Sequence, residues 1–349
     1  MKKNSLTTLV LVICCCFSEL VHCEELLHLN KIALPDRAVT LYLYIKPIDS
    51  GLAIEAEFKS QKTSFKVGNF PAEKLKAFLD LNSKPSDRNY SKVAPILKEY
   101  GRTFFRPIKK FLRQCTEIEF VIGNDSLISY PFDFLIFEGK PLFLQKPIAY
   151  SFKRIGPRRF NLKDVSGALL ISDKTADPQR AVIKVQKYIP NNRYRDIAEI
   201  KPTDFKAMDF IDLLLMSAHG HIFADEDDYI EFGDDRLKTN HLANLRPRMV
   251  YLDSCFMGSS LDFIKLFRSN EAAFYIAPIV PNEAGNSSTK TMTLFFEAFD
   301  IYGCPVYAMY LTRCQLYEHF SKQGMNFMLF FRSFPFRVYR LEGKHLPVG

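Results

Sequence analysis

Short apolar runs alternate with amphipathic stretches along most of the chain. A run of a few apolar residues bounded by polar residues or Gly is typical of a strand buried on both faces of a sheet. Such runs predict core strands at residues 167–172, 211–217, 249–253 and 273–277. Helical patterns separate or flank them at residues 178–188, 239–245, 260–268 and 287–299. This alternation predicts an α/β fold, a three-layer sandwich in which a mostly parallel sheet is flanked by helices.

The first part of the chain has a different pattern. Residues 39–67 alternate apolar and polar positions around a turn, which predicts a β-hairpin. A proline suits the first turn of a helix predicted at residues 71–81, and the polar stretch 82–89 is the best candidate for a linker. We therefore predict a small β-rich N-terminal segment at residues 24–89, followed by a larger domain at residues 90–349.

The larger domain contains further elements outside its core alternation. Helical patterns occupy residues 91–100, 103–115 and 311–320, a strand is predicted at 117–122, and short strands fall within 132–150. The stretch 327–339 is densely aromatic. A run of this kind is more often core or docking surface than a ligand site.

Residues 1–23 have the pattern of a targeting segment. Lys2 and Lys3 precede an apolar core at residues 6–17, which is too short to span a bilayer, and a cleavage position follows near Cys23. We therefore expect a signal peptide and an exported protein, secreted or periplasmic, with no membrane span after cleavage. The alternative is a lipoprotein acylated at one of the cysteines at 14–16, but Ile13 is not the small residue that such a site needs.

Net charge limits the class of binding partner, and cysteine content limits the possible disulfide bonds. The formal net charge is +8, and part of the excess lies in Lys109, Lys110 and Arg113. The basic residues form no interleaved aromatic or groove-reading motif, so a solvated face is favoured and no nucleic-acid partner is expected. Four cysteines remain after cleavage of the signal peptide. If one of them is a free nucleophile, three are left, and an odd number argues against a full disulfide framework. The spacing of Cys304 and Cys314 would still permit a disulfide that closes a small loop.

Two of the apolar runs end close to a reactive residue. The run at 211–217 leads into His219-Gly220, and the run at 249–253 leads into Cys255. Since ligands bind beyond the carboxyl ends of parallel strands, these two residues are expected to meet in one crevice. An imidazole activates a thiol by taking its proton or by pairing with the thiolate. We predict a catalytic dyad of His219 and Cys255, with the N–H groups of Gly220 and Cys255 as oxyanion hole. No third member of a triad is evident.

The same residues carry a family resemblance. An apolar run into His219-Gly220, followed by one into Asp253-Ser254-Cys255, resembles the caspase-like clan of cysteine peptidases. Ordered blocks between residues 103 and 151 and at 272–281 resemble CHAT domains within this clan, and the likeness covers roughly residues 90–325. The resemblance implies a caspase-like sandwich, a cysteine endopeptidase activity on a protein or peptide substrate, and catalytic roles for His219 and Cys255.

The nucleophile motif departs from the CHAT pattern. CHAT domains commonly carry Ser-Ala-Cys, whereas Asp253-Ser254-Cys255 is closer to metacaspases, and His221 is a second histidine that the family usually lacks. Resemblance to metacaspases implies that Asp253 faces the S1 pocket. There a carboxylate pairs with a basic side chain, so cleavage after Arg or Lys is expected.

Two other interpretations use the same residues. In the first, the protein keeps the fold without catalysis and serves as an interaction or scaffold module. If the protein is an enzyme, we expect the pKa of the Cys255 thiol to be lowered, so that the thiol is alkylated at mildly acidic pH. His219 and His221 could bind zinc with Cys255 or His241, yet the chain has no Cys-X-X-Cys and no helical His pair, so we expect no metal and no cofactor. Acidic runs such as the one at residues 225–228 are most often solvated. Calcium binding by this run is suggested only by analogy with metacaspases.

Overall fold

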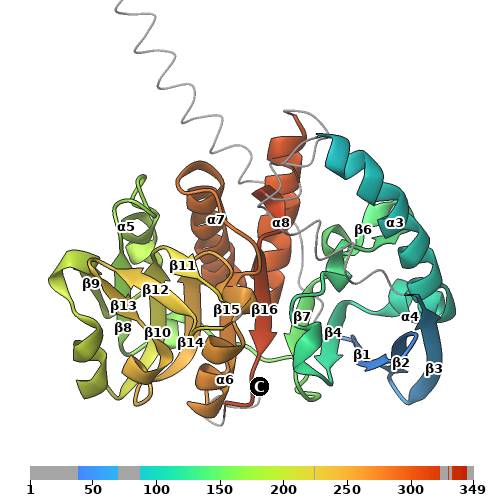
Figure 1. Ribbon diagram of the computed structural model, residues 1–349, viewed down its shortest axis with the longest axis horizontal. Coiled ribbons are helices and arrows are strands. Elements are labelled where there is room, and N and C mark those ends of the chain that lie inside the picture. The colour runs from blue at the N-terminus through green and yellow to red at the C-terminus, as the bar shows by residue number, and fades with distance from the viewer. Residues whose placement is uncertain (1–37, 70–86, 224, 323–328, 330–331, 344–349) are drawn as a thin grey trace, which may run out of the picture. The chain divides into compact units, whose positions relative to one another are not determined.

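A mixed sheet of 11 strands is the centre of the protein (Figure 1). The computed structural model describes residues 38–343 apart from 70–86, 224, 323–328 and 330–331. The strands of this sheet are β1 (Thr40–Ile48), β2 (Gly51–Phe58), β3 (Gln61–Gly68), β4 (Glu117–Ile122), β7 (Ile148–Ser151), β8 (Ala168–Ser172), β9 (Asn192–Asp196), β10 (Phe210–Ser217), β14 (Arg246–Asp253), β15 (Phe274–Pro278) and β16 (Phe336–Arg340).

Most strands of the sheet run parallel. Their order is β3-β2-β1-β4-β7-β16-β15-β14-β10-β8-β9. Only the pairs β1–β2, β2–β3 and β15–β16 are antiparallel. The predicted α/β class, with a mostly parallel sheet and a β-rich N-terminal segment, is confirmed. Strand β1 pairs with β4, so the N-terminal strands continue the same sheet.

Helices cover both faces of the sheet. They are α3 (Asp87–Phe105), α4 (Lys109–Gln114), α5 (Ala181–Val185), α6 (Leu261–Ser269), α7 (Asn286–Tyr302) and α8 (Pro305–Ser321). In β14, Tyr251 contacts the rings of Phe295 and Phe296 in α7. The adjacent Val250 belongs to the core cluster that contains Phe263 of α6. Because successive side chains of a strand point to opposite faces, α7 and α6 lie on opposite sides, which gives three layers.

The strand order locates a natural binding crevice. Strands β9-β8-β10-β14-β15 repeat the 2-1-3-4-5 order of doubly wound sheets, and the order reverses between β8 and β10. In such sheets, ligands bind outside the carboxyl ends of the strands at this reversal. The ends of β8, β10 and β14 therefore define the region in which to look for a site.

Two differences from the predicted helices have physical reasons. Residues 91–100 and 103–115, predicted as two helices, belong largely to the continuous α3 and to α4. Gly101 does not break α3: a Cβ there would lie 2.1 Å from Ile136 O, so glycine serves close packing. The helix predicted at 239–245 is only a 3-10 turn, Thr239–His241, because pairing with β10 extends the chain from Arg246.

Other predictions from the sequence were incomplete or concern residues outside the described part of the chain. The sequence pattern did not reveal β9 or β16, and β16 occupies part of the aromatic stretch. Residues 1–23 and the helix at 71–81 lie outside the described residues, as do residues 82–86 of the linker, while 87–89 begin α3. Cys304 and Cys314 are free thiols at the start and the third turn of α8, about 15 Å apart along the helix axis, so they cannot bond.

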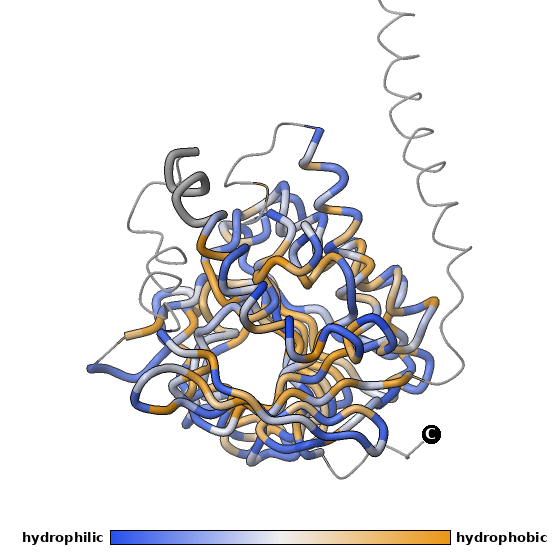
Figure 2. Tube along the Cα trace, turned by 90° about the vertical axis from the view of Figure 1, so that its right-hand side faces the viewer, coloured by the Kyte–Doolittle hydropathy of each residue, from blue (hydrophilic) through white to orange (hydrophobic). Residues whose placement is uncertain are grey.

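The hydropathy of the segments follows the layers. Figure 2 shows apolar segments mostly in the interior and hydrophilic segments mostly on the outer turns. Within the part of the chain that the structure describes, no helix combines the length and apolar character needed to cross a bilayer.

Candidate active site

The paired ends of β10 and β14 bring the two predicted catalytic residues to one edge of the sheet. Ser217 lies opposite Asp253 in the parallel register, and His219 and Cys255 each follow two residues later. A Cβ added to Gly220 would lie 2.5 Å from Cys255 O and 3.1 Å from Cys255 N. The His-Gly turn therefore lies against the backbone of Cys255, and only glycine permits this approach.

His219 is oriented by a residue that sequence reasoning missed. Its Nε2 lies 3.0 Å from Thr175 Oγ1, and the Thr175 N–H donates to Asp173 Oδ1. Thr175 is exposed and follows β8, across the reversal of strand order. A hydroxyl residue just after the neighbouring strand was the available signal. Among the described residues, no hydrogen bond joins His219 to Cys255, which is common for catalytic pairs without substrate.

The Cys255 thiol is half-buried and protonated in this arrangement. Its Sγ accepts a hydrogen bond from the Asn282 N–H at 3.4 Å. Burial raises the pKa of the thiol, and the Asp253 charge adds to this, while the Asn282 N–H opposes it. The pKa of the Cys255 thiol is therefore raised, not lowered as expected, because burial outweighs the hydrogen bond from Asn282.

The Gly220 N–H points toward a free strand edge. Strands β11 (Gly220–His221), β12 (Tyr229–Phe232) and β13 (Asp235–Leu237) form a small sheet in which β11 is an edge strand. Glu231 N donates to His219 O at 2.8 Å, while Gly220 lies opposite Ile230. Hydrogen-bonded and non-hydrogen-bonded pairs alternate in antiparallel ladders, so the Gly220 N–H is directed away from β12. Among the described residues, no strand pairs with this side of β11, so the Gly220 N–H can bind an oxyanion beside Cys255.

Asp253 is a buried carboxylate surrounded by neutral donors. Its Oδ2 accepts hydrogen bonds from Ser217 Oγ at 2.8 Å and Ser288 Oγ at 2.6 Å, and its Oδ1 from Asn282 Nδ2 at 2.6 Å. Burial raises the pKa of Asp253, against the effect of these donors, and the charge of Asp177 adds to the rise. No cation among the described residues forms an ion pair with Asp253.

Ser217, Asn282 and Ser288 were not predicted from the sequence. They come from β10, from the loop after β15 and from α7, so only the tertiary structure brings them together. The Asn282 Oδ1 is also buried and has no hydrogen-bond partner. The carboxylate and this amide form a buried polar cluster next to Cys255.

The histidines of the zinc interpretation have separate partners. His221 Nε2 lies 2.7 Å from Glu231 Oε1, and His241 Nδ1 accepts a hydrogen bond from the Lys238 N–H. The described residues contain no group of three or more His, Cys, Asp or Glu placed to hold a metal ion.

The acidic run precedes β12 and is held by hydrogen bonds and ion pairs. Asp228 is buried and accepts a hydrogen bond from Ser260 Oγ at 2.6 Å, which attaches the hairpin to α6. Asp227 pairs with Lys238 at 3.1 Å. Burial raises the pKa of Asp228, and the charges of Asp262 and Asp227 add to it.

Comparison with known proteins adds no family assignment. Neither a protein-family model nor a curated protein sequence matches the chain. The resemblance to CHAT domains stays a prediction from the residues, and the case for a function depends on the geometry around His219, Cys255 and Asp253.

Proposed function

We propose that the chain is a cysteine endopeptidase of the caspase-like, CHAT-domain kind, with His219 as base and Cys255 as nucleophile. The observation that carries this proposal is the contact between Gly220 and the Cys255 backbone, at the carboxyl ends of β10 and β14. Through this contact an imidazole, a thiol and the Gly220 N–H lie at one edge of the sheet. Such a constellation suits acyl transfer.

The proposed reaction begins from a neutral thiol. On substrate binding, His219 takes the Sγ proton as Sγ attacks the peptide carbonyl carbon, and the N–H groups of Gly220 and Cys255 stabilise the oxyanion. The C–N bond then breaks, and the leaving amine takes the proton from His219. Water, deprotonated by His219, attacks the acyl-enzyme, which releases the carboxylic acid and restores the thiol.

A basic P1 residue fits the buried carboxylate. Asp253 has hydrogen-bond donors but no ion pair among the described residues, and burial of such a charge without a cation is costly. A guanidinium or ammonium group of the substrate supplies this cation and gains charge-assisted hydrogen bonds. We propose cleavage after Arg or Lys on this ground.

Export is part of the proposal, with support from the sequence of residues 1–23 alone. In this view a signal peptide sends the enzyme to a secreted or periplasmic location, where its substrate is a protein or peptide. The rival proposal is a scaffold with the same fold. It predicts that Cys255 has no special reactivity.

Covalent labelling tests the enzyme against the scaffold. A peptidyl acyloxymethyl ketone with Arg at P1 should modify Cys255, because the nucleophile displaces the carboxylate leaving group only where a carbonyl is bound and activated. Mass spectrometry should find the label on Cys255 and not on Cys115, Cys304 or Cys314. His219→Ala should slow labelling at least about a hundredfold, since it removes the base.

The controls separate chemistry from accessibility. Cys255→Ala gives the background, and the same ketone with Asp at P1 tests the specificity. Label distributed over all four cysteines, or a rate that does not depend on His219, would favour the scaffold.

Thr175 offers a prediction about orientation of the base. Thr175→Val should lower kcat about tenfold and shift the pH–rate profile, because the His219 imidazole loses its hydrogen bond at Nε2. Thr175→Ser retains the hydroxyl and should restore both. Steady-state kinetics with an Arg-containing peptide measure the effect. Thr175 is exposed, so the unfolding temperature should stay the same; an unchanged profile for Thr175→Val would show that the contact is incidental.

A further inference from the structure

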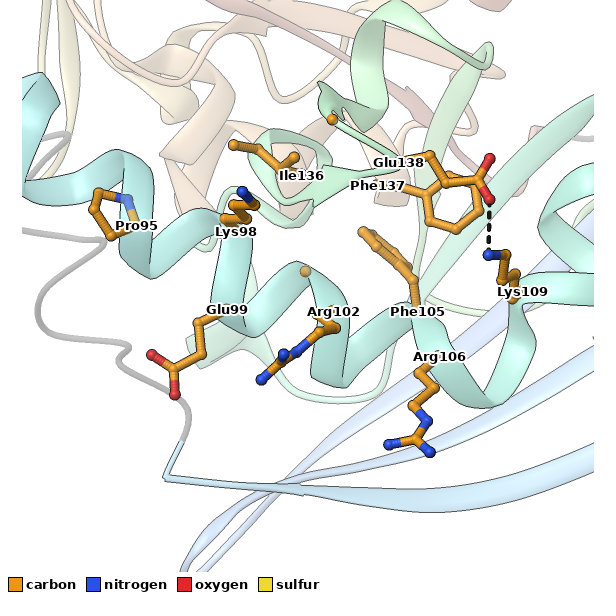
Figure 3. A pocket seen from close by; sticks show the side chains of 12 residues that line it. Pro95, Lys98, Glu99, Arg102, Phe105, Arg106, Lys109, Ile136, Phe137 and Glu138 are labelled. Atoms are coloured by element: carbon orange, nitrogen blue, oxygen red, sulfur yellow. Dashed lines mark ion pairs between the residues drawn. The ribbon is translucent and has the colours of Figure 1, made fainter.

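A second site lies between α3 and the β-hairpin of β5 (Ile136–Phe137) and β6 (Lys140–Pro141). It is a pocket of about 610 Å³, and none of its lining residues belongs to the candidate active site (Figure 3). This volume falls within the range of small-molecule sites. Most of the wall is apolar, and Phe105, Ile136 and Phe137 contribute to it.

The walls of the pocket are set by tight packing. Gly101 lets the hairpin backbone approach α3, since a Cβ would lie 2.1 Å from Ile136 O. Phe105 and Phe137 meet edge to face with centroids 5.7 Å apart, and both rings are buried. A pocket whose walls are fixed in this way is preformed, so ligand binding has a small entropic cost for ordering the walls.

Cations dominate the rim. Lys98, Arg102 and Arg106 are exposed and spaced four residues apart, so they share one side of α3 and its continuation. Within the described ranges, these three side chains form no hydrogen bond or ion pair. Like charges at this spacing repel one another. A bound anion would offset that repulsion.

The acidic residues of the rim do not neutralise these three cations. Glu138 pairs with Lys109 at 3.0 Å and with Arg113 at 2.6 Å. Their hydrogen bonds lower the pKa of Glu138, so it stays ionised and engaged with those two partners. Glu99 is the other carboxylate among the described residues that line the pocket. The rim therefore keeps an excess of positive charge above an apolar wall.

We infer that this pocket binds a small amphipathic carboxylate, whose apolar chain lies against the apolar wall at Ile136 and whose head meets Arg102 and Arg106. Guanidinium groups bind carboxylates through paired, charge-assisted hydrogen bonds. The apolar wall excludes a purely ionic ligand such as free phosphate as the best match. The inference is independent of the peptidase proposal, because the two sites share no residue.

Fluorescence titration with 11-(dansylamino)undecanoic acid tests the site. The acid should bind saturably with one molecule per chain, and its methyl ester, which lacks the charge, should bind at least about tenfold more weakly. Arg102→Gln with Arg106→Gln should weaken binding of the acid by a similar factor. Both side chains are exposed, so thermal unfolding should confirm that the variant is folded.

Lys110→Gln is the matched control, because Lys110 is an exposed cation on α4 that does not line the pocket. It should leave binding of the acid unchanged. Equal binding of acid and ester, or an unchanged affinity in the double variant, would overturn the inference. Sedimentation with phosphatidylglycerol vesicles without binding of the free acid would also overturn it, because the cations would then serve a membrane surface.

Discussion

Asp253→Asn should abolish most turnover of peptides with Arg or Lys at P1 while leaving the protein folded. The substitution removes the charge that a basic side chain would pair with, and loss of a desolvated ion pair lowers kcat/KM by about a hundredfold to a thousandfold. Peptides with Leu at P1 should lose much less. Rates on peptides that differ only at P1 measure the ratio.

The fold should tolerate this change because the site can accommodate an amide. The amide oxygen of the substituted side chain would accept the hydrogen bonds from Ser217 and Ser288 that Asp253 Oδ2 accepts now. The new NH₂ group would face Asn282, whose amide can turn to present the Oδ1 that now lacks a partner. The turn exchanges an unpartnered Asn282 Oδ1 for an unpartnered Asn282 Nδ2, so the number of unsatisfied buried groups does not rise and no large penalty arises.

The stability of Asp253→Asn should also depend on pH in a defined direction. Burial raises the pKa of Asp253, so the folded state holds its proton in a range where the unfolded state has lost it. The free energy of unfolding of the wild type therefore falls as pH rises from the usual carboxyl pKa toward the raised one. An amide does not ionise and avoids this fall. Thermal unfolding should show that the stability of the variant relative to the wild type increases from acidic to neutral pH.

Asp228→Asn is the matched control, since Asp228 is also a buried carboxylate of raised pKa but accepts its hydrogen bonds from Phe223 and Ser260. It should show the pH effect on stability and keep the turnover of Arg peptides. If Asp253→Asn turns over Arg peptides normally, or if the wild type prefers Asp or Leu at P1, Asp253 does not recognise the substrate.

Arg340→Met should destabilise the protein by about 3–5 kcal/mol and lower Tm by roughly 10 °C. Arg340 of β16 is fully buried, and its guanidinium binds both oxygens of Glu117 at 2.6 and 2.7 Å and Glu119 at 3.1 Å. The substitution would leave two buried carboxylates without their cation. Removal of one partner from a buried ion pair is costly for this reason. Thermal unfolding monitored by circular dichroism measures the loss.

Two further variants separate this effect from a general effect of removing charge. Arg113→Gln removes an arginine from the exposed pair with Glu138 and should change the unfolding free energy by less than about 0.5 kcal/mol. Adding Glu117→Gln to Arg340→Met removes one uncompensated carboxylate and should recover part of the loss. Equal unfolding temperatures for Arg340→Met and Arg113→Gln would show that the buried cluster contributes no net stability.

The sequence by itself determined the fold class and the place of the candidate dyad. Buried strands are recognisable in a sequence as apolar runs. Strands β8, β10, β14 and β15 correspond closely to the runs predicted at 167–172, 211–217, 249–253 and 273–277. The ends of parallel strands meet at one edge, so the residues after β10 and β14 had to be neighbours.

Only the tertiary structure decided what surrounds that dyad. Thr175 beside His219, and the donors from β10, the loop after β15 and α7 around Asp253, come from segments far apart in the chain. Polar side chains have no periodic signature that reveals their partners, and a thiol pKa depends on burial and nearby charges. Strand β16 escaped prediction for the same reason, since its buried Arg340 is stabilised by Glu117, which is distant in sequence.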